Sequence, residues 1–458
     1  MKKLNRTFIG IIIILCIGLY GNTVFNHFSL DDSYLTEATE IKKGIAGIPD
    51  IFTSFYEADS DGKSYGYRPL VRTTFAIEQS LTGIHPGVSH AINILFYILL
   101  GLILFKVLKR LFRDYNLFFP FLITVLFIAH PVHTEIVASL KNRDEIMAFG
   151  FALLALDYLL KFIDFKKNKH LVWGIVFYLM AFLSKASVFG FLVAIPLIFY
   201  YFTKIKLKHI LILGAAFLGA SLFAALFPKV VLPDMNRPIE MVENPLPFVD
   251  SIWEHLGTGL YIILYYLRLL LYPHPLVFYY GYNMVPVVNL ANVWVILSFV
   301  IYAGMFVYAI MKIKEKNVLS FAILFFMVSI GMYSNMLVPI PGIIAERFLL
   351  IPSLAFSIAI IYLLFKAFKI DFKSPSQFNS KMAWVALVVF IIFIPYAIKT
   401  YSRNIDWRTK FMLYDADLPH LENSVKAHDF YAEQLMRQVN EELKKPVDVT
   451  RFLRPTID

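Results

Sequence analysis

Two neighbouring carboxylates, Asp31 and Asp32, follow the first apolar segment of the chain in the sequence FSLDDSY. They stand where a hydrophobic helix would leave a membrane and a long polar segment begins. A carboxylate with a raised pKa in such a place can act as a general base toward a hydroxyl acceptor. An aspartate at a helix start can instead cap the free N–H groups there, so the pair alone supports either interpretation.

A second polar group ends another apolar segment in AHPVHTEIVASLKNRDE, with His130, His133 and Glu135 close together and Arg143 just behind. Histidine and carboxylate side chains at this spacing could bind zinc or a hard cation, so a divalent metal stays open as an alternative. The spacing is not HExxH, and no second ligand set is apparent. Hydrogen-bonding roles or an interfacial cap are therefore favoured, and no cofactor is assigned.

Further charged residues stand at the ends of apolar segments on the same side, namely Arg68, Lys185, Glu346 and Arg347. A single Arg or Lys at a helix end usually extends to the membrane surface. As a group, however, these cations oppose the charge bias that sets topology, which predicts an anionic ligand. A lipid phosphate fits, because Arg binds phosphate through two N–H groups and Lys binds it as a point charge. The aromatic stretch 278–282 could stack on a sugar, although an interfacial aromatic belt also explains it.

The elements that must position these residues are membrane helices. Of the 458 residues, 58% are hydrophobic and 17% are charged, against about 25% charged in soluble proteins. This composition excludes a soluble enzyme, a nucleic-acid-binding domain and a disordered chain, so nucleic acid is not an expected partner. The net charge of +10 lies in short loops, where it sets topology and contacts anionic membrane lipids. The single cysteine, Cys16, excludes disulfides and cysteine-ligated zinc.

Twelve apolar blocks lie near 8–25, 89–109, 117–137, 145–163, 171–184, 187–203, 208–228, 252–272, 290–311, 317–337, 347–367 and 382–400. Basic residues before the first block place the N-terminus inside, and that block is interpreted as an uncleaved span. If every block crosses, the Lys-rich loop at 312–316 falls outside, whereas it falls inside if 252–272 is re-entrant or interfacial. We therefore predict an all-α polytopic membrane protein with about eleven transmembrane helices, or twelve, and an outer C-terminus.

The long polar segments then lie on the outer face, and the first of them, 26–88, is the longest. Within it, RPLVRTTFAIEQSL predicts an amphipathic helix on the outer interface. Residues 1–400 are expected to form the transmembrane domain, and residues 401–458 an outer helical tail with an amphipathic helix at 421–443. No repeat of 30–40 residues is visible in the chain.

Several short motifs occur in a characteristic order: FSLDDSYL, YRPL with TTFAIE, GVSHAINILFYILL, HPVHTEIVASLKNRDE, LSKAS and ERFLLIPS. In this order they resemble the transmembrane-and-tetratricopeptide-repeat O-mannosyltransferases and their bacterial relatives, which have the C-type glycosyltransferase fold. The resemblance covers nearly all of residues 1–435. The tail that begins SRNIDW resembles the junction where such proteins start their helical repeats.

The resemblance implies an enzyme that passes a monosaccharide, mannose by family, from a polyprenyl-phosphate carrier to an acceptor hydroxyl on the outer face. The acceptor would be protein Ser/Thr, a lipid or a glycan. The acidic motif maps onto Asp31 and Asp32, with the first aspartate as the base. The other motifs map onto the substrate- and phosphate-binding residues Arg68, His130, His133, Glu135, Arg143, Lys185 and Arg347.

Two departures from the family pattern concern the acceptor and one cation. LSKAS lacks the glutamate that commonly follows its lysine in relatives, and the repeat array is absent or reduced to one helix. The Lys-, Ile- and Phe-rich composition suggests a bacterial cytoplasmic membrane, with undecaprenyl phosphate as carrier. Two alternatives remain, a non-catalytic scaffold of the same fold and a secondary transporter. A transporter would place its polar site near the membrane midplane and show inverted repeats, and neither is apparent.

Overall fold

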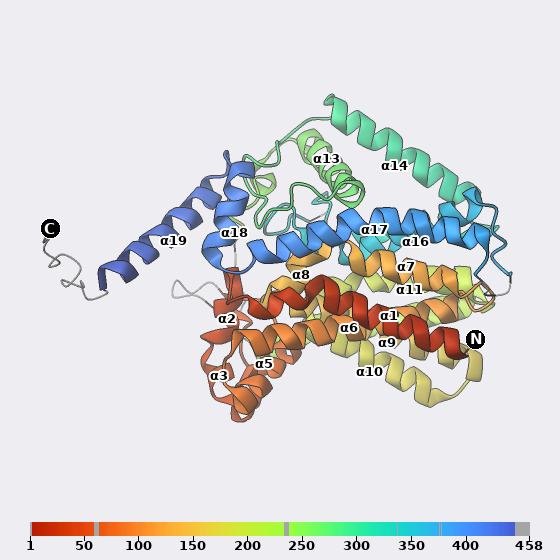
Figure 1. Ribbon diagram of the computed structural model, residues 1–458, viewed down its shortest axis with the longest axis horizontal. Coiled ribbons are helices and arrows are strands. Elements are labelled where there is room, and N and C mark those ends of the chain that lie inside the picture. The colour runs from red at the N-terminus through yellow and green to blue at the C-terminus, as the bar shows by residue number, and fades with distance from the viewer. Residues whose placement is uncertain are drawn as a thin grey trace, which may run out of the picture.

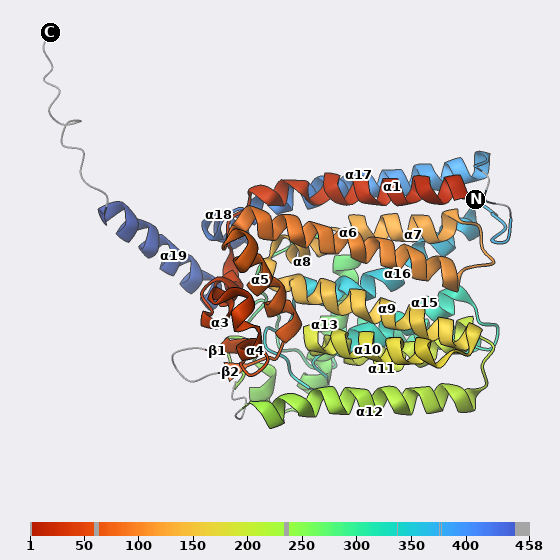
Figure 2. The same cartoon turned by 90° about the horizontal axis from the view of Figure 1, so that it is seen from below.

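Long helices run side by side and connect through two opposite sets of loops (Figures 1 and 2). The computed structural model describes residues 2–58, 64–232, 238–336, 338–374, 376 and 378–444. The longer helices are α1 (Lys2–Tyr20), α5 (Pro69–Thr82), α6 (Pro86–Leu111), α7 (Phe118–Ala129), α9 (Arg143–Phe165), α10 (Asn168–Ser184), α11 (Phe191–Phe202), α12 (Leu207–Val231), α13 (Ile252–Leu271), α14 (Val293–Met311), α15 (Val318–Gly331), α16 (Leu350–Ala367), α17 (Ser380–Asp406) and α19 (Val425–Lys444). The short elements are α2 (Ser33–Thr36), α3 (Thr39–Lys42), α4 (Ile48–Ile51), α8 (Thr134–Ala138), α18 (Lys410–Asp417) and a hairpin of β1 (Glu57–Ala58) and β2 (Ser64–Tyr65).

The predicted class, a polytopic all-α membrane protein, is confirmed. Within the described ranges, seven helices are long and apolar enough to cross a membrane, or eight if the bent pair α7–α8 is one span. This is fewer than the eleven or twelve that the apolar blocks predict. The difference arises because α10, α11 and α15 have 17, 12 and 14 residues, below the roughly 20 needed to span. Helix α13 is long enough, but Glu254 and Arg268 interrupt its apolar sequence.

Most of the loops at one end of the bundle contain lysine, and we call this the basic end. It consists of Lys2 and the loops 112–117, 166–167, 203–206, 312–317 and 368–374, and the N-terminus lies there in Figure 2. Lys316 donates to the Thr203 carbonyl at 3.1 Å, and the Asn116 N–H donates to the Phe372 carbonyl at 2.6 Å. The segments before and after α13 both lie at the opposite end, where Tyr279 Oη donates to the Val242 carbonyl at 2.9 Å. This agrees with the prediction that residues 252–272 do not cross, since the Lys-rich loops then share one side.

The helix that carries the histidine motif breaks at Pro131. A proline lacks a backbone donor and clashes with the preceding turn, and α7 and α8 are bent by 57° at this point. Residues 130–142 then form a buried connector that leads into α9. The break turns polar side chains toward the end of the bundle opposite to the basic end, which we call the site end.

The long first loop folds as a separate hydrophobic layer on the site end. Its core is formed by Leu35, Ile41, Ile51, Val71 and Phe75, among others. The predicted amphipathic helix is present as α5, which buries Val71 and Phe75 against this layer. The layer therefore gives the segment with the acidic pair a fixed support.

The tail is continuous with the bundle. A domain boundary at residue 400 would fall inside α17, where Arg403 and Asn404 are buried. Asn404 Nδ2 donates to the Leu19 carbonyl at 2.8 Å, which ties the end of α17 to α1. The helix expected at 421–443 is present as α19, and it extends away from the site end in Figure 2.

Candidate active site

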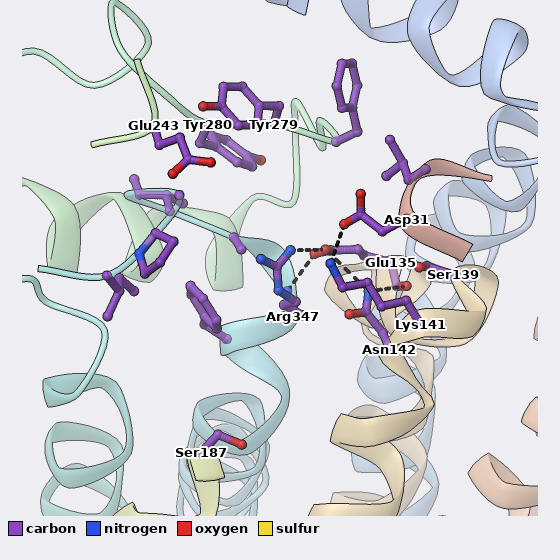
Figure 3. Close-up of a pocket in the computed structure, with 18 of the residues that line it drawn as sticks. Asp31, Glu135, Ser139, Lys141, Asn142, Ser187, Glu243, Tyr279, Tyr280 and Arg347 are labelled. Atoms are coloured by element: carbon purple, nitrogen blue, oxygen red, sulfur yellow. Dashed lines mark hydrogen bonds and ion pairs between the residues drawn. The ribbon is translucent and has the colours of Figure 1, made fainter. Parts of the chain in front are cut away.

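A cavity of about 610 Å³ opens at the site end (Figure 3). Five of the residues predicted from the motifs line it: Asp31, Arg68, Glu135, Lys185 and Arg347. Other polar lining residues are Tyr34, Tyr67, Ser139, Lys141, Asn142, Ser187, Glu243, Tyr279, Tyr280, Tyr333 and Lys426. The motif residues are far apart in sequence, and they meet because each follows or precedes a helix end at the site end.

Asp31 is the accessible member of the acidic pair. Its side chain is 49% exposed to the cavity and forms an ion pair with the Lys141 ammonium. Burial acts to raise the pKa of Asp31, but the charge and hydrogen bond of Lys141 outweigh it and hold the pKa below its ordinary value. Asp31 is therefore ionised at neutral pH and presents a carboxylate to whatever occupies the cavity.

Asp32 is buried and does not line the cavity. One of its carboxyl oxygens accepts the Ser29 N–H at 2.9 Å, and the other accepts the Lys141 N–H at 3.0 Å. The Asp32 backbone N–H in turn donates to the Ser29 carbonyl at 2.9 Å, which closes a short helical turn. Burial raises the pKa of Asp32 to about 7 despite the two hydrogen bonds that its carboxylate accepts. The cap interpretation of the pair thus holds for Asp32, which joins the acidic loop to the 130–142 connector.

Arg347 and Glu135 form the centre of the cavity wall in Figure 3. Arg347 Nη1 lies 2.5 Å from Glu135 Oε1, and the Arg347 backbone N–H donates to Oε2 at 2.8 Å. The Arg347 side chain is 29% exposed. Its Nε and Nη2 have no hydrogen-bond acceptor in the described parts of the chain, so half of the guanidinium fork remains open toward the cavity.

A second ionic cluster closes the side of the cavity nearest the bundle. Asp144 pairs with Arg68 at 2.5 Å and with Lys185 at 3.1 Å, and Glu145 pairs with Lys185 at 2.9 Å. Ser187 Oγ donates to Glu145 at 3.2 Å. Each of these two cations already has a carboxylate partner from the start of α9. An incoming anion would therefore share them with Asp144 and Glu145 rather than meet free charges.

The two histidines of the motif are buried behind the cavity. His130 Nε2 donates to the Leu270 carbonyl at 3.0 Å. His133 lies 2.7 Å from Tyr97 Oη and 2.9 Å from Ser353 Oγ. Both rings therefore join helices of the bundle, and neither lines the cavity.

Arg143 and Glu346 also lie outside the lining. Arg143 is fully buried, pairs with Glu78, and donates to Asn93 at 2.6 Å, to Thr74 at 2.8 Å and to the Ser89 carbonyl at 3.1 Å. Glu346 accepts the Val277 N–H at 2.6 Å and the Tyr280 hydroxyl at 3.1 Å.

Arg143 and Glu346 both stabilise segments that lie next to the cavity. Arg143 fixes the first turn of α9 against α5 and α6. Glu346 fixes the segment 277–280, which forms one wall.

No metal centre is found in the part of the chain that the structure describes, where no group of three or more His, Cys, Asp or Glu side chains is placed to hold an ion. The motif carboxylate Glu135 is engaged with Arg347, and the two histidines are engaged with bundle residues. All three side chains therefore have protein partners in hydrogen bonds or an ion pair.

Sequence reasoning missed the cavity residues that come from outside the motifs. Lys426 and Phe430 of α19 and Glu243 all line the cavity. The sequence around these residues does not indicate a role in the cavity, because they reach it only through the packing of the tail on the segment 277–280. Lys141 lies inside the motif HPVHTEIVASLKNRDE, but it is 110 residues from Asp31, so the sequence does not indicate their ion pair.

The fold and the cavity together define a multi-pass membrane protein with a cavity of about 610 Å³, lined by charged side chains, at one end of its helix bundle. No protein-family model matches the chain. Similarity to curated proteins, however, extends over most of its length. The chain is 26% identical over 429 residues to the protein O-mannosyl-transferase F38B6.6 of Caenorhabditis elegans, covering 91% of the chain and 58% of that protein.

Two further relatives have similar names. The chain is 23% identical over 480 residues to the human protein O-mannosyl-transferase TMTC3, covering 96% of the chain and 50% of that protein. It is 22% identical over 497 residues to the mouse protein O-mannosyl-transferase TMTC2, covering 87% and 57% respectively. The resemblance inferred from the motifs is thereby confirmed. The chain spans between 50% and 58% of the length of these curated relatives.

Proposed function

We propose that this protein is a membrane glycosyltransferase that transfers mannose from a polyprenyl-phosphate carrier to a Ser or Thr hydroxyl of a protein. The relatives named protein O-mannosyl-transferases support the reaction class. The observation that carries the proposal is the cavity, in which the ionised Asp31 and the half-open guanidinium of Arg347 face the same space.

The proposed roles follow from charge. Asp31 accepts the proton of the acceptor hydroxyl as its oxygen attacks the anomeric carbon, and the carbon–oxygen bond to the carrier phosphate breaks. Negative charge then grows on the leaving phosphate. Donors aimed at that charge stabilise the transition state more than the ground state. Arg347 is suited to this because its Nε and Nη2 edge matches two phosphate oxygens.

Lys185 and Arg68 would supply further positive charge on the bundle side of the cavity. Both are held by Asp144, so their positions are fixed before a phosphate arrives. Such preorganisation avoids the cost of ordering long side chains during the reaction. The protein then needs no site for a nucleotide sugar, since the mannose is carried by the lipid phosphate.

The orientation is part of the same proposal. Lysine-rich loops face the cytoplasm in membrane proteins, so the basic end would be inside and the cavity and the tail outside. The membrane would be a bacterial cytoplasmic membrane, and the carrier undecaprenyl phosphate. A lipid or glycan acceptor, a non-catalytic scaffold and a secondary transporter are the competing outcomes of the test.

The test uses the full chain in nanodiscs with radiolabelled polyprenyl-phosphate mannose and a Ser/Thr-rich peptide, with and without EDTA. Label on the peptide is the expected result. Label transferred only to a lipid or glycan would replace the acceptor. A chain that binds the carrier but leaves the sugar attached, with every acceptor offered, would favour the scaffold. Uptake of a solute driven by an ion gradient would favour the transporter.

A further inference from the structure

The tail helix α19 forms part of the cavity wall. Lys426 and Phe430, in its first two turns, line the same cavity as Asp31. Lys426 Nζ donates to Glu243 at 3.1 Å, and its ammonium lies over the rings of Tyr279 and Phe430 at 5.8 and 5.7 Å. The tail therefore contributes side chains directly to the chamber.

Three aromatic rings gather at this place, and we call Phe278, Tyr279 and Phe430 the aromatic wall. The ring centroid of Phe430 lies 6.3 Å from that of Phe278 and 6.3 Å from that of Tyr279. Tyr414 of α18 packs behind them, 4.7 Å from Phe278. Rings at these distances support one another in fixed orientations.

A buried ion pair of the tail fixes the aromatic wall. Asp417, at the end of α18, accepts the Phe278 N–H at 2.7 Å. The same carboxylate pairs with Arg403 through two contacts of 2.5 and 2.7 Å, and both side chains are almost fully buried. The wall is thus held from behind by α17 and α18, so its position is set before any ligand enters.

The aromatic wall lies away from the phosphate-binding side. In Figure 3, Tyr279, Tyr280 and Glu243 stand on one side of the Arg347–Glu135 pair, Asp31 and Lys141 stand on the other, and Ser187 lies toward the bundle. Under the proposed function, a lipid-borne donor would enter from the membrane around the bundle. Helices α18 and α19 lie at the site end, beyond the bundle helices. An acceptor that arrives from the aqueous side therefore meets the aromatic wall and Lys426 first.

We propose that the aromatic wall, with Lys426 and Glu243, is the acceptor subsite and binds an extended polypeptide segment around the reacting hydroxyl. This rests on the proposed function. Aromatic faces pack on peptide planes and small side chains without selecting one residue type. Lys426 offers a donor and Glu243 an acceptor, which match the carbonyl and N–H groups of an extended backbone. Phe430 and Lys426 are the tail residues that would contact the acceptor segment.

The first experiment measures binding without turnover. A fluorescent Ser/Thr-rich peptide is titrated against the full chain, against Phe430→Ala and Lys426→Met, and against the control Tyr431→Ala. Tyr431 also contributes a ring to the packing of α18 on α19, 5.9 Å from Phe411, but it does not line the cavity. Weakening of about tenfold in Phe430→Ala, on the scale of one lost aromatic contact, with little change in Tyr431→Ala, is expected. Equal affinity in all four proteins, or no peptide binding to the full chain, overturns the subsite.

The second experiment separates this inference from the proposed function. Transfer of labelled mannose to the peptide is compared with its release to water in the same reactions. The ratio of transfer to release should fall about tenfold in Phe430→Ala through a higher KM for the peptide. A full chain that neither transfers nor releases mannose would defeat the proposed function, while the binding titration would still decide the subsite. An unchanged ratio in an active protein would defeat the subsite alone.

Discussion

Replacing Arg347 by lysine tests how the cavity binds phosphate. The guanidinium uses Nη1 to hold Glu135 at 2.5 Å and leaves the Nε and Nη2 edge toward the cavity. Lysine keeps the positive charge but has one compact ammonium, which cannot hold Glu135 and offer two parallel donors to phosphate together. Arg347→Lys therefore isolates the loss of the fork from the loss of charge.

The magnitude follows from the hydrogen bonds involved. A hydrogen bond between charged groups contributes about 1.5–3 kcal/mol, and each 1.4 kcal/mol is about tenfold in affinity. Loss of one charge-assisted contact should thus raise the Kd for polyprenyl phosphate about 10- to 150-fold. Arg347→Met would do more, but it would also leave Glu135, whose side chain is 6% exposed, without its partner. An unpaired buried charge costs about 3–5 kcal/mol of stability, which would confuse the measurement.

The assay titrates polyprenyl phosphate without sugar into the full chain in detergent at fixed ionic strength. Arg110→Lys is the matched control, because Arg110 is 22% exposed, also pairs with carboxylates, and lies at the basic end of α6. The reasoning is refuted if Arg347→Lys binds the phosphate as tightly as the unaltered protein. It is refuted equally if Arg110→Lys weakens binding to the same extent.

Three further substitutions test the surroundings of the cavity. Lys141→Met should move the acid limb of the pH–rate profile to higher pH. The variant removes the largest of the charges that lower the pKa of Asp31, and only Arg347 and Lys410 then oppose burial. A limb that stays in place contradicts this. Asp32 has a pKa of about 7 in the folded protein and an ordinary, lower pKa in the unfolded chain. The folded state therefore holds a proton that the unfolded chain loses, and the free energy of unfolding falls as the pH rises from about 4 to 7. Asp32→Asn should lack that decline in thermal unfolding, and an identical decline would refute the assignment. Arg403→Ala should lower the free energy of unfolding by about 3–5 kcal/mol, because it leaves Asp417 buried and unpaired. The double variant Arg403→Leu, Asp417→Leu should lose less stability. Equal unfolding temperatures in the two variants would contradict this.

The placement of the motif residues at one end was predictable from the sequence. Asp31, Glu135 and Arg347 each stand within a few residues of an apolar block, and the alternation of basic loops assigns those block ends to one side. Once the helices pack as a bundle, residues at the same end of neighbouring helices come together, and this is enough to bring these three residues to one cavity. The helix break at Pro131 was not predicted, since the hydrophobic pattern indicates one apolar block at 117–137, although a proline inside a helix can cause such a break.

The choice between neighbouring residues was not predictable. Asp31 and Asp32 are adjacent and chemically alike, yet one faces the cavity and the other accepts two backbone N–H groups. The direction of each depends on the 130–142 connector, which is remote in sequence. His133 similarly faces Tyr97 and Ser353, because the bend at Pro131 turns its ring into the bundle.

The number of spans and the contribution of the tail to the cavity were also not predictable from the hydrophobic pattern of the sequence. Apolar blocks of similar length predict similar spans, but turns at Lys185 and Asn317 shorten α10 and α15. Phe430 reaches the cavity through packing between α18, α19 and the segment 277–280. Contacts of that range leave no periodic trace in the sequence.

The proposed role of Asp31 is to accept the proton of the acceptor hydroxyl in this cavity, and a comparison of transfer rates tests that role. The rate of mannose transfer from polyprenyl-phosphate mannose to a Ser/Thr-rich peptide is measured for the unaltered chain, Asp31→Asn and Asp164→Asn. Asp164 is a partly exposed aspartate in an ion pair with Arg110 at the basic end, and it controls for loss of a paired carboxylate. We expect Asp31→Asn to reduce kcat at least about 100-fold, the usual scale of general-base catalysis. Carrier binding by this variant and the turnover of Asp164→Asn should stay near the values of the unaltered chain. Turnover by Asp31→Asn at the unaltered rate would contradict the proposed role.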